Sequence, residues 1–455
     1  MDKSQTIKYL KGFFQEIEDM TEFEMQEFII NEILKMPYRS VDRKKVQKIM
    51  GNNYVPGLFW IRDRRANPAF LLEESEIDLD EWIHRKLDVE IDQLYKSEEL
   101  SEKIKKLGKE KVISHAKNVL MFLDCDNNSL IDKIINQEYS DIFRRILMLI
   151  LTGNSLYIFN NNEKFNELGK NIVPLILENT QEYDFRNRLF QSIASGLIGM
   201  DIKESNISTA PISLDNNFYI EENNVFEMTN LIEGYINDKD KIGIDCFEQY
   251  FEEVINGKAL KMAWITDDYI ETIFELKFIE EQLKYNASIT FTLIPRYDSY
   301  SNDASYNDIM EMLSLNILTE LNKYYANGRF RVCRNGMDIS TFDGNRMSEE
   351  VYEIIDTADV VVISGARAYE MSQGMNKIVY YTGIAVCKGY TESITGFSKN
   401  SGKLIFLRQD KGERSFEDFS RRATRRMETE KGTIPVAGKT AIEYYYERYG
   451  ADEIG

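Results

Sequence analysis

The sequence predicts an α/β protein with a mainly helical amino-terminal domain and a three-layer α/β/α domain that contains a mostly parallel sheet. Up to about residue 205, apolar residues recur at i, i+3 and i+4, the spacing of amphipathic helices. From about residue 241, short apolar runs alternate with amphipathic stretches, a pattern typical of strands joined by crossover helices. We therefore expect a helical domain over 1–205, a connection over 206–240 and an α/β domain with a carboxyl-terminal helix over 241–455.

The helical periodicity of the amino-terminal part is clearest in four segments. These segments are residues 9–20, 22–36, 129–151 and 187–200, and further helices are expected to start near Asp42 and Asp78. Residues 206–240 begin with a polar, asparagine-rich and less periodic stretch, which favours a connection between domains.

Six apolar runs are the expected strands of the sheet. They are residues 260–265, 288–294, 330–333, 359–364, 377–386 and 403–408. The amphipathic segments between them predict helices over 268–284, 306–325 and 347–357, and residues 440–450 predict a terminal helix.

Composition limits the classes of function. The chain has 455 residues, of which 43% are hydrophobic, and 56 basic against 76 acidic side chains give a net charge of −20. This excess argues against a nucleic-acid partner or an anionic membrane surface, because both carry phosphates that an acidic surface repels.

The four cysteines form no Cys-x-x-Cys pair, which argues against a zinc ribbon. The amino-terminal segment is too charged for a signal peptide, and the apolar run 146–151 is too short to span a bilayer. We expect a cytoplasmic protein.

Histidine is scarce, because His84 and His115 are the only two in the sequence. Both lie in lysine-rich, helix-like segments, so we expect structural histidines and no histidine-rich metal site. Residues 432–440 resemble a phosphate-binding P-loop but have five residues between the glycines where the motif has four. The basic run 421–426 is either a solvated helix face or a local anion or partner site.

Acidic residues gather where the expected strands end, which is where open α/β sheets bind ligands. Asp267, Asp268 and Glu271 follow the run 260–265, and Asp303 follows the run 288–294. One such Asp can cap a helix, but adjacent carboxylates repel each other unless a cation lies between them. Oxygen ligands suit Mg²⁺ or Mn²⁺, and other divalent ions can also bind them.

Two later strand ends supply groups that suit an anion. Gly365 and Arg367 follow the run 359–364, where a glycine allows close approach of the backbone and Arg supplies a forked donor. Lys388 follows the run 377–386. Successive strand ends thus carry two or more acids, then one acid, and then a glycine with an arginine. This is the composition of a metal-assisted phosphoryl site.

These residues resemble the motifs of the metal-dependent damage-control phosphatases, the family of domain of unknown function eighty-nine. That family has a strand-end Asp-Asn-x-x-Glu, then Asp-[Val/Ala]-[Thr/Ser], then Lys-Gly-x-x-Asn-[Phe/Tyr]-Glu. Here the segments 267–271 (DDYIE), 303–305 (DAS) and 364–370 (SGARAYE) are similar to these three in order and spacing, and 153–155 (GNS) resembles a further Gly-Asn segment. The resemblance covers residues 140–410.

The resemblance implies a role for each matched position. Asp267, Asp268 and Asp303 would be metal ligands, Asn154 would face the site, and Ser364, Arg367 and Glu370 would line a phosphate pocket. The sequence departs from the family where Ser364 replaces Lys, Ala368 replaces Asn and Asp268 replaces Asn. Arg367, Arg296 or Lys388 would then have to supply the missing positive charge.

The leading hypothesis is a cytoplasmic metal-dependent phosphatase of small, sugar-phosphate-like metabolites that uses Mn²⁺, Mg²⁺, Co²⁺ or Ni²⁺. In it, Asp267 and Arg367 are the catalytic residues, and Asn154, Glu271, Arg296, Ser364, Gly365, Glu370 and Lys388 bind substrate. Two alternatives stay open. One is a metal- or ligand-binding module without catalysis, and the other is a carboxyl methyltransferase, as in the older description of an animal member of the family.

Overall fold

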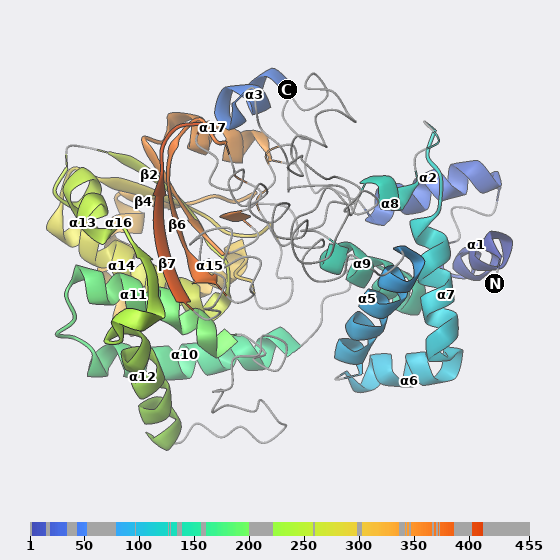
Figure 1. The fold of residues 1–455 in the computed structure, drawn as a ribbon, viewed down its shortest axis with the longest axis horizontal. Coiled ribbons are helices and arrows are strands. Elements are labelled where there is room, and N and C mark those ends of the chain that lie inside the picture. Colours follow the sequence, from blue (N-terminus) through green and yellow to red (C-terminus); the bar gives the residue numbers. More distant parts are fainter. Residues whose placement is uncertain are drawn as a thin grey trace, which may run out of the picture. The chain divides into compact units, whose positions relative to one another are not determined.

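We describe the protein from a computed structural model, in which the described residues form two compact units (Figure 1). The described residues are 2–14, 19–33, 43–51, 79–95, 97–125, 127, 129–133, 139–155, 161–199, 222–257, 260–297, 303–335, 342, 344, 347–365, 368–369, 372, 374–385 and 403–412. The helical unit contains the described residues of 1–37 and 57–159, and the α/β unit contains those of 38–56 and 160–422. No helix in these residues is long and apolar enough to cross a membrane.

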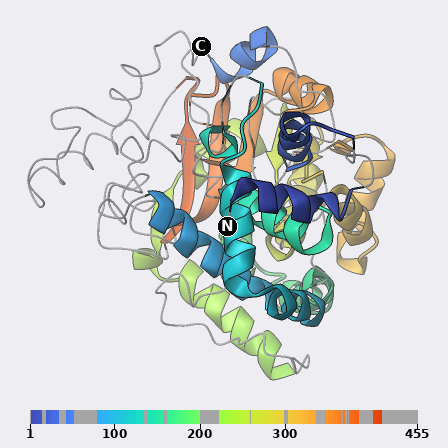
Figure 2. The same ribbon diagram turned by 90° about the vertical axis from the view of Figure 1, so that its right-hand side faces the viewer.

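The helical unit consists of seven helices in its described residues (Figure 2). They are α1 (Lys3–Lys11), α2 (Glu22–Ile33), α5 (Leu79–Leu94), α6 (Glu98–Leu107), α7 (Lys109–Leu120), α8 (Leu130–Lys133) and α9 (Tyr139–Thr152). His115 on α7 is buried, its Nδ1 lies 2.9 Å from the hydroxyl of Thr6, and its ring stacks on Tyr9. These contacts attach α1 to α7, so His115 has a structural role.

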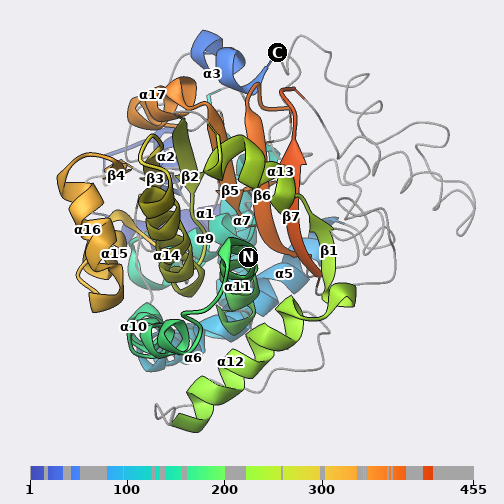
Figure 3. The same cartoon turned by 90° about the vertical axis from the view of Figure 1, so that its left-hand side faces the viewer.

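The α/β unit is built on a seven-stranded sheet of order β1-β7-β6-β5-β2-β3-β4 (Figure 3). The strands are β1 (Ile242–Asp245), β2 (Lys261–Ile265), β3 (Thr290–Ile294), β4 (Phe330–Val332), β5 (Val360–Ser364), β6 (Ile378–Ala385) and β7 (Lys403–Gln409). β6, β5, β2, β3 and β4 are parallel, β7 is antiparallel to β6, and β1 is parallel to β7. The predicted α/β fold with a mostly parallel sheet is confirmed.

Helices lie around this sheet. They are α3 (Arg43–Met50), α10 (Asn161–Asn179), α11 (Phe185–Gly199), α12 (Glu222–Ile236), α13 (Phe247–Tyr250), α14 (Tyr269–Tyr285), α15 (Tyr306–Met312), α16 (Thr319–Ala326) and α17 (Glu349–Thr357). Shorter turns are η4 (Lys239–Lys241), the π-helical η5 (Phe251–Ile255) and η6 (Asn316–Leu318).

The largest apolar core lies between one face of the sheet and α10–α14. Trp264 of β2 and Val362 of β5 point into it, and Phe278 of α14 packs against the Trp264 ring at 6.1 Å between centroids. Neighbouring residues of the same strands, such as Val361 next to Val362, face the opposite side of the sheet because the side chains of a strand alternate. α17 contacts β2 and α3 there. The register pairs Ile265 with both Ile294 and Ile363, so β2, β3 and β5 end at the same level.

Several features differ from the sequence-based expectations. The helix α12 lies within the expected connection 206–240, because its apolar residues pack in the core of the sheet unit. α10 and α11 belong to the sheet unit although they fall in the segment 1–205, because their apolar faces pack on α14 and β6. The expected helix 306–325 is divided into α15 and α16 by η6, and β1 was not expected. The segments 421–426, 432–440 and 440–450 lie outside the described residues.

Candidate metal centre

The loops that follow β2 and β3 are joined to each other through their backbones. The amide of Ala304 donates to the carbonyl of Asp267 at 3.0 Å, and Asp268 and Asp303 form an antiparallel bridge. Because β2 and β3 are parallel neighbours, both loops leave the carboxyl edge of the sheet. The bridge therefore places Asp303 beside the adjacent pair Asp267 and Asp268, although the two loops are separated by a helix and a strand in the sequence.

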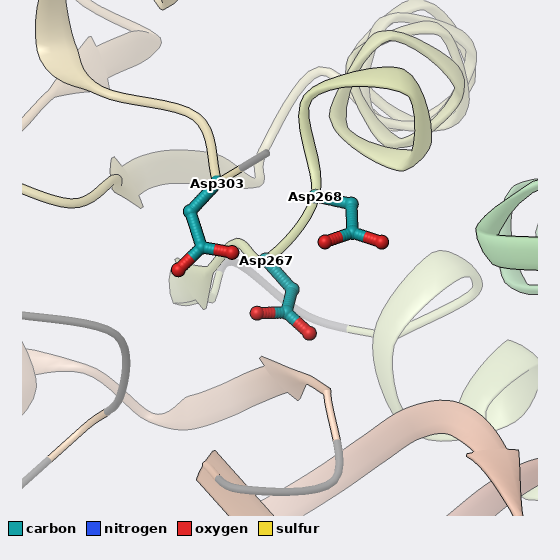
Figure 4. A group of neighbouring side chains, drawn as sticks. All are labelled: Asp267, Asp268 and Asp303. Carbon is teal, nitrogen blue, oxygen red and sulfur yellow. The ribbon is translucent and has the colours of Figure 1, made fainter. Parts of the chain in front are cut away.

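The carboxylates of Asp267, Asp268 and Asp303 converge (Figure 4). Each offers an oxygen, and these oxygens lie within 4.8 Å of one another. Asp303 is buried, and the other two side chains are half-buried. Three like charges this close repel each other, and a divalent cation with a preference for oxygen ligands would remove that repulsion. The cluster that the sequence predicts is thus present and can hold a metal ion.

Helix capping does not account for these aspartates. Asp268 is the N-cap residue of α14, but its side chain makes no capping hydrogen bond there. Asp303 lies before α15, whose cap is instead Ser305, in a reciprocal capping box with Asp308. Helix capping, the usual structural role of an Asp before a helix, therefore does not explain Asp268 or Asp303.

Arg296 supplies a positive charge inside the cluster. Its Nη2 donates to Oδ1 of Asp267 at 2.8 Å, and its Nε donates to Oδ2 of Asp303 at 3.1 Å. The side chain is only 1% exposed, and its Nη1 has no hydrogen-bond partner among the described residues. Sequence analysis assigned Arg296 to substrate, whereas the structure shows it bonded to two of the expected metal ligands.

Gly365, at the end of β5, closes the cluster on another side. Its φ is +92°, and a Cβ added there would lie 2.0 Å from Oδ2 of Asp267. A glycine is therefore required both by the backbone conformation and by the close approach of the carboxylate. The glycine singled out at this strand end does contact the site, through Asp267.

Two further carboxyl groups lie on the first turns of α14, behind the aspartates. Glu271 and Glu275 are 5% and 0% exposed, and each has one oxygen without a hydrogen-bond partner in the described part of the chain. Burial, followed by repulsion from Glu275, Asp267 and Asp268, raises the pKa of Glu271 well above its usual range. Burial also raises the pKa of Glu275 to about 7, although a hydrogen bond from Ser364 opposes the shift.

Ser364 is engaged in the core of the sheet. Its hydroxyl donates to Oε1 of Glu275 and accepts from Thr382 at 2.9 Å and from Nε1 of Trp264 at 3.3 Å. The residue is fully buried. Side chains from β2, β5, β6 and α14 thus meet at this hydroxyl, immediately before Gly365. Sequence analysis missed Glu275, although its i, i+4 spacing from Glu271 on a helix that begins at the acidic strand end was a signal for it.

Of the other predicted substrate contacts, only Asn154 lies within the described residues. Asn154 is exposed in the helical unit, where its amide donates to the hydroxyl of Thr152 at 3.2 Å. Arg367, Glu370 and Lys388 lie outside the described residues, so their assignments remain predictions.

Comparison with known proteins yields a structural likeness. No protein-family model and no curated protein matches the sequence. A solved structure of a DUF89 family protein from Pyrococcus horikoshii is similar to this chain. Its TM-score is 0.49 and its sequence identity 16%, over 71% of this chain and 97% of that chain.

Replacing Gly365 should disturb Asp267 directly. Gly365→Ala places a methyl group where the carboxylate lies and strains a left-handed backbone, so we expect a loss of about 1–3 kcal/mol in stability. We also expect Mn²⁺ binding to weaken by about 10-fold or more, as when the support of a metal ligand is lost. Thermal unfolding and titration calorimetry measure the two effects.

Gly412→Ala is the matched control, because Gly412 also has a positive φ, +74°, but has no atom within 4 Å of an added Cβ. It should lose stability and keep the Mn²⁺ affinity of the unmodified protein. Equal Mn²⁺ affinity in the two variants would show that Gly365 does not hold Asp267 in place.

Glu275 should make stability depend on pH. Its carboxyl binds a proton more tightly in the folded state, with a pKa of about 7 against the usual 4.5, so its contribution to stability is lost as pH rises between these values. Gln does not titrate. As pH rises from 5 to 8, the free energy of unfolding of Glu275→Gln should therefore increase by on the order of 1–3 kcal/mol relative to that of the unmodified protein.

The measurement is urea unfolding in EDTA across this pH range. The exposed Glu320 of α16, which pairs with Lys323, provides the control, since Glu320→Gln removes only a surface ion pair and should change stability by less than about 1 kcal/mol. A pH-independent difference for Glu275→Gln would contradict the assignment.

Proposed function

We propose that this chain is a cytoplasmic metal-dependent phosphatase that hydrolyses small phosphorylated metabolites. The observation that carries the proposal is the convergence of Asp267, Asp268 and Asp303 at the carboxyl edge of the sheet. The side chains of Asp268 and Asp303 do not cap the helices that follow them. The half-buried oxygens of Asp267 and Asp268 make the cluster reachable for a cation and a small substrate. The motif order of these segments, which resembles that of damage-control phosphatases, supports the same function.

In this proposal, Asp267, Asp268 and Asp303 would hold a divalent ion. The bound ion supplies a Lewis acid that polarises the phosphoryl group and orients a water molecule for attack. Burial of Asp303 and Arg296 removes water from one side of the cluster, which strengthens electrostatic interactions within it. Arg367, in the segment after Gly365, would donate to phosphate oxygens as their negative charge develops, and Lys388 and Glu370 would contact the substrate.

The buried carboxyls behind the cluster favour an anionic substrate when they are protonated. A raised pKa keeps Glu271 and Glu275 neutral over more of the physiological range, so they do not add to the negative charge that a phosphate must approach. The three aspartates, one Arg and a divalent ion then sum to no net charge, which removes the repulsion against a phosphomonoester.

Loss of one ligand should abolish the activity. Asp267→Asn should lower metal-dependent phosphate release by about 10²-fold or more, the scale of losing one electrostatic contact to the transition state. The assay uses the full chain with p-nitrophenyl phosphate and a panel of sugar phosphates, with Mg²⁺, Mn²⁺, Co²⁺ or Ni²⁺.

Asp410→Asn is the control, because Asp410 follows β7 at the opposite edge of the sheet, where it pairs with Arg408. It should retain full activity. Metal binding without phosphate release would indicate a binding module in place of an enzyme. Release that does not change in Asp267→Asn would refute the proposed site.

Asp268 separates metal affinity from substrate affinity. Asp268→Asn keeps an oxygen ligand but removes one negative charge, so Mn²⁺ should bind several-fold more weakly while an anionic substrate meets less repulsion. At saturating Mn²⁺ we expect a lower KM for the phosphorylated substrate, measured by steady-state kinetics. An unchanged KM together with an unchanged Mn²⁺ affinity would show that Asp268 lies outside the site.

A further inference from the structure

Arg296 is a buried cation that contacts two acids from different loops. Its Nη2 lies 2.8 Å from Oδ1 of Asp267, which follows β2, and its Nε lies 3.1 Å from Oδ2 of Asp303, which follows β3. Its side chain is 1% exposed. A guanidinium in this position joins the two loops through charge-assisted hydrogen bonds, which are stronger when solvent is excluded.

The position of Arg296 is set by the backbone. It follows Pro295 directly after β3, its amide donates to the carbonyl of Ala304 at 2.9 Å, and it pairs with Ser305 in a parallel bridge. The loop that places Asp303 in the cluster therefore also places Arg296. The loop backbone thus fixes the base of the Arg296 side chain, and the two aspartates hold its buried guanidinium.

The charges of the cluster show what this contact achieves. Three aspartates within 4.8 Å bring three negative charges together, and Arg296 supplies one positive charge in contact with two of them. The sum for these four side chains is −3 + 1 = −2, which one divalent cation would neutralise. In the metal-free protein, Arg296 supplies the positive charge that opposes the repulsion between Asp267 and Asp303.

We propose that Arg296 is the internal counter-cation of the metal centre: it holds Asp267 and Asp303 together in the metal-free protein, so that the α/β unit stays folded when the metal leaves. The inference rests on the proposed metal site, but it does not depend on the phosphatase reaction. Arg296 acts here as a positioning residue. Because Arg296 and the metal both stabilise the same carboxylates, removing Arg296 transfers that stabilisation to the metal.

The test compares thermal unfolding of the full chain in EDTA and in saturating MnCl₂. Arg296→Gln should have a clearly lower Tm in EDTA, and Mn²⁺ should restore most of the loss. Its Mn²⁺-induced rise in Tm should be roughly twofold or more that of the unmodified protein, since the metal now offsets repulsion that Arg296 offset before. Arg296→Lys keeps the charge but loses the forked contact, and its rise should fall between the two.

Arg188 provides the matched control. It is also 1% exposed and pairs with a carboxylate, Glu281, but it lies on α11 and contacts Thr180 and Gln191, outside the cluster. Arg188→Gln should lose stability equally with and without Mn²⁺. A merely structural role for Arg296 predicts the same behaviour for Arg296→Gln, and that result would overturn the proposal.

The remaining outcomes also decide the matter. If Arg296→Gln does not fold even with Mn²⁺, Arg296→Lys decides. If Mn²⁺ then raises the Tm of Arg296→Lys no more than that of the unmodified protein, the proposal is overturned. If Mn²⁺ shifts no Tm and calorimetry detects no binding, both the metal site and this inference fail. If Mn²⁺ stabilises Arg296→Gln as expected but no phosphoester is hydrolysed, the inference stands and the proposed function fails.

Discussion

The organisation of the α/β unit depends on how it accommodates negative charge at one edge of its sheet. Five carboxyl groups gather where β2 and β3 end: Asp267, Asp268, Glu271, Glu275 and Asp303. Left ionised and unpaired, such groups would destabilise the fold, because repulsion and the cost of burial add to each other. Two features reduce this cost: the buried guanidinium of Arg296 contacts the aspartates, and the pKa values of Glu271 and Glu275 are raised. The cation that we propose would be the third.

α14 is the element that forces this arrangement. It starts one residue after the aspartate pair, runs against the sheet and is covered by α10, α11 and α16, so it is buried along most of its length. Its first turns lie under the cluster, where Glu271 is buried and forms no ion pair with a basic side chain among the described residues. Gly196 of α11 lies against this carboxyl, and an added Cβ there would be 3.3 Å from its Oε2. Close packing of two helices thus converts an acidic helix start into a set of buried acids.

The sequence predicts the strands and the aspartates well, because both depend on local patterns. β2 and β5 are apolar over most of their length, as strands covered on both faces must be. Asp267 and Asp268 closely follow β2, and Asp303 lies in the loop after β3. β1 is four residues long with intermediate burial, so its sequence lacks that signal. The pairing of Arg296 with Asp267 could not be predicted, since it depends on a bridge between two loops and on burial that no spacing encodes.

Ser364 shows how the charge of this site differs from that of the family its motifs resemble. The resemblance implies a Lys at the end of β5, but the Ser364 hydroxyl is fully buried and bonded to Glu275, Thr382 and Trp264. A Lys at this position would bring its ammonium group to Glu275, a buried carboxyl whose pKa is already raised, and the pair would be ionised. With Ser, the carboxyl can remain protonated, and among the described residues the positive charge beside the aspartates is that of Arg296 after β3. Because Arg296 is bonded to two aspartates, it cannot serve a phosphate as a mobile Lys would. In the proposed function, recognition of an anion at this edge would therefore depend more heavily on a bound cation.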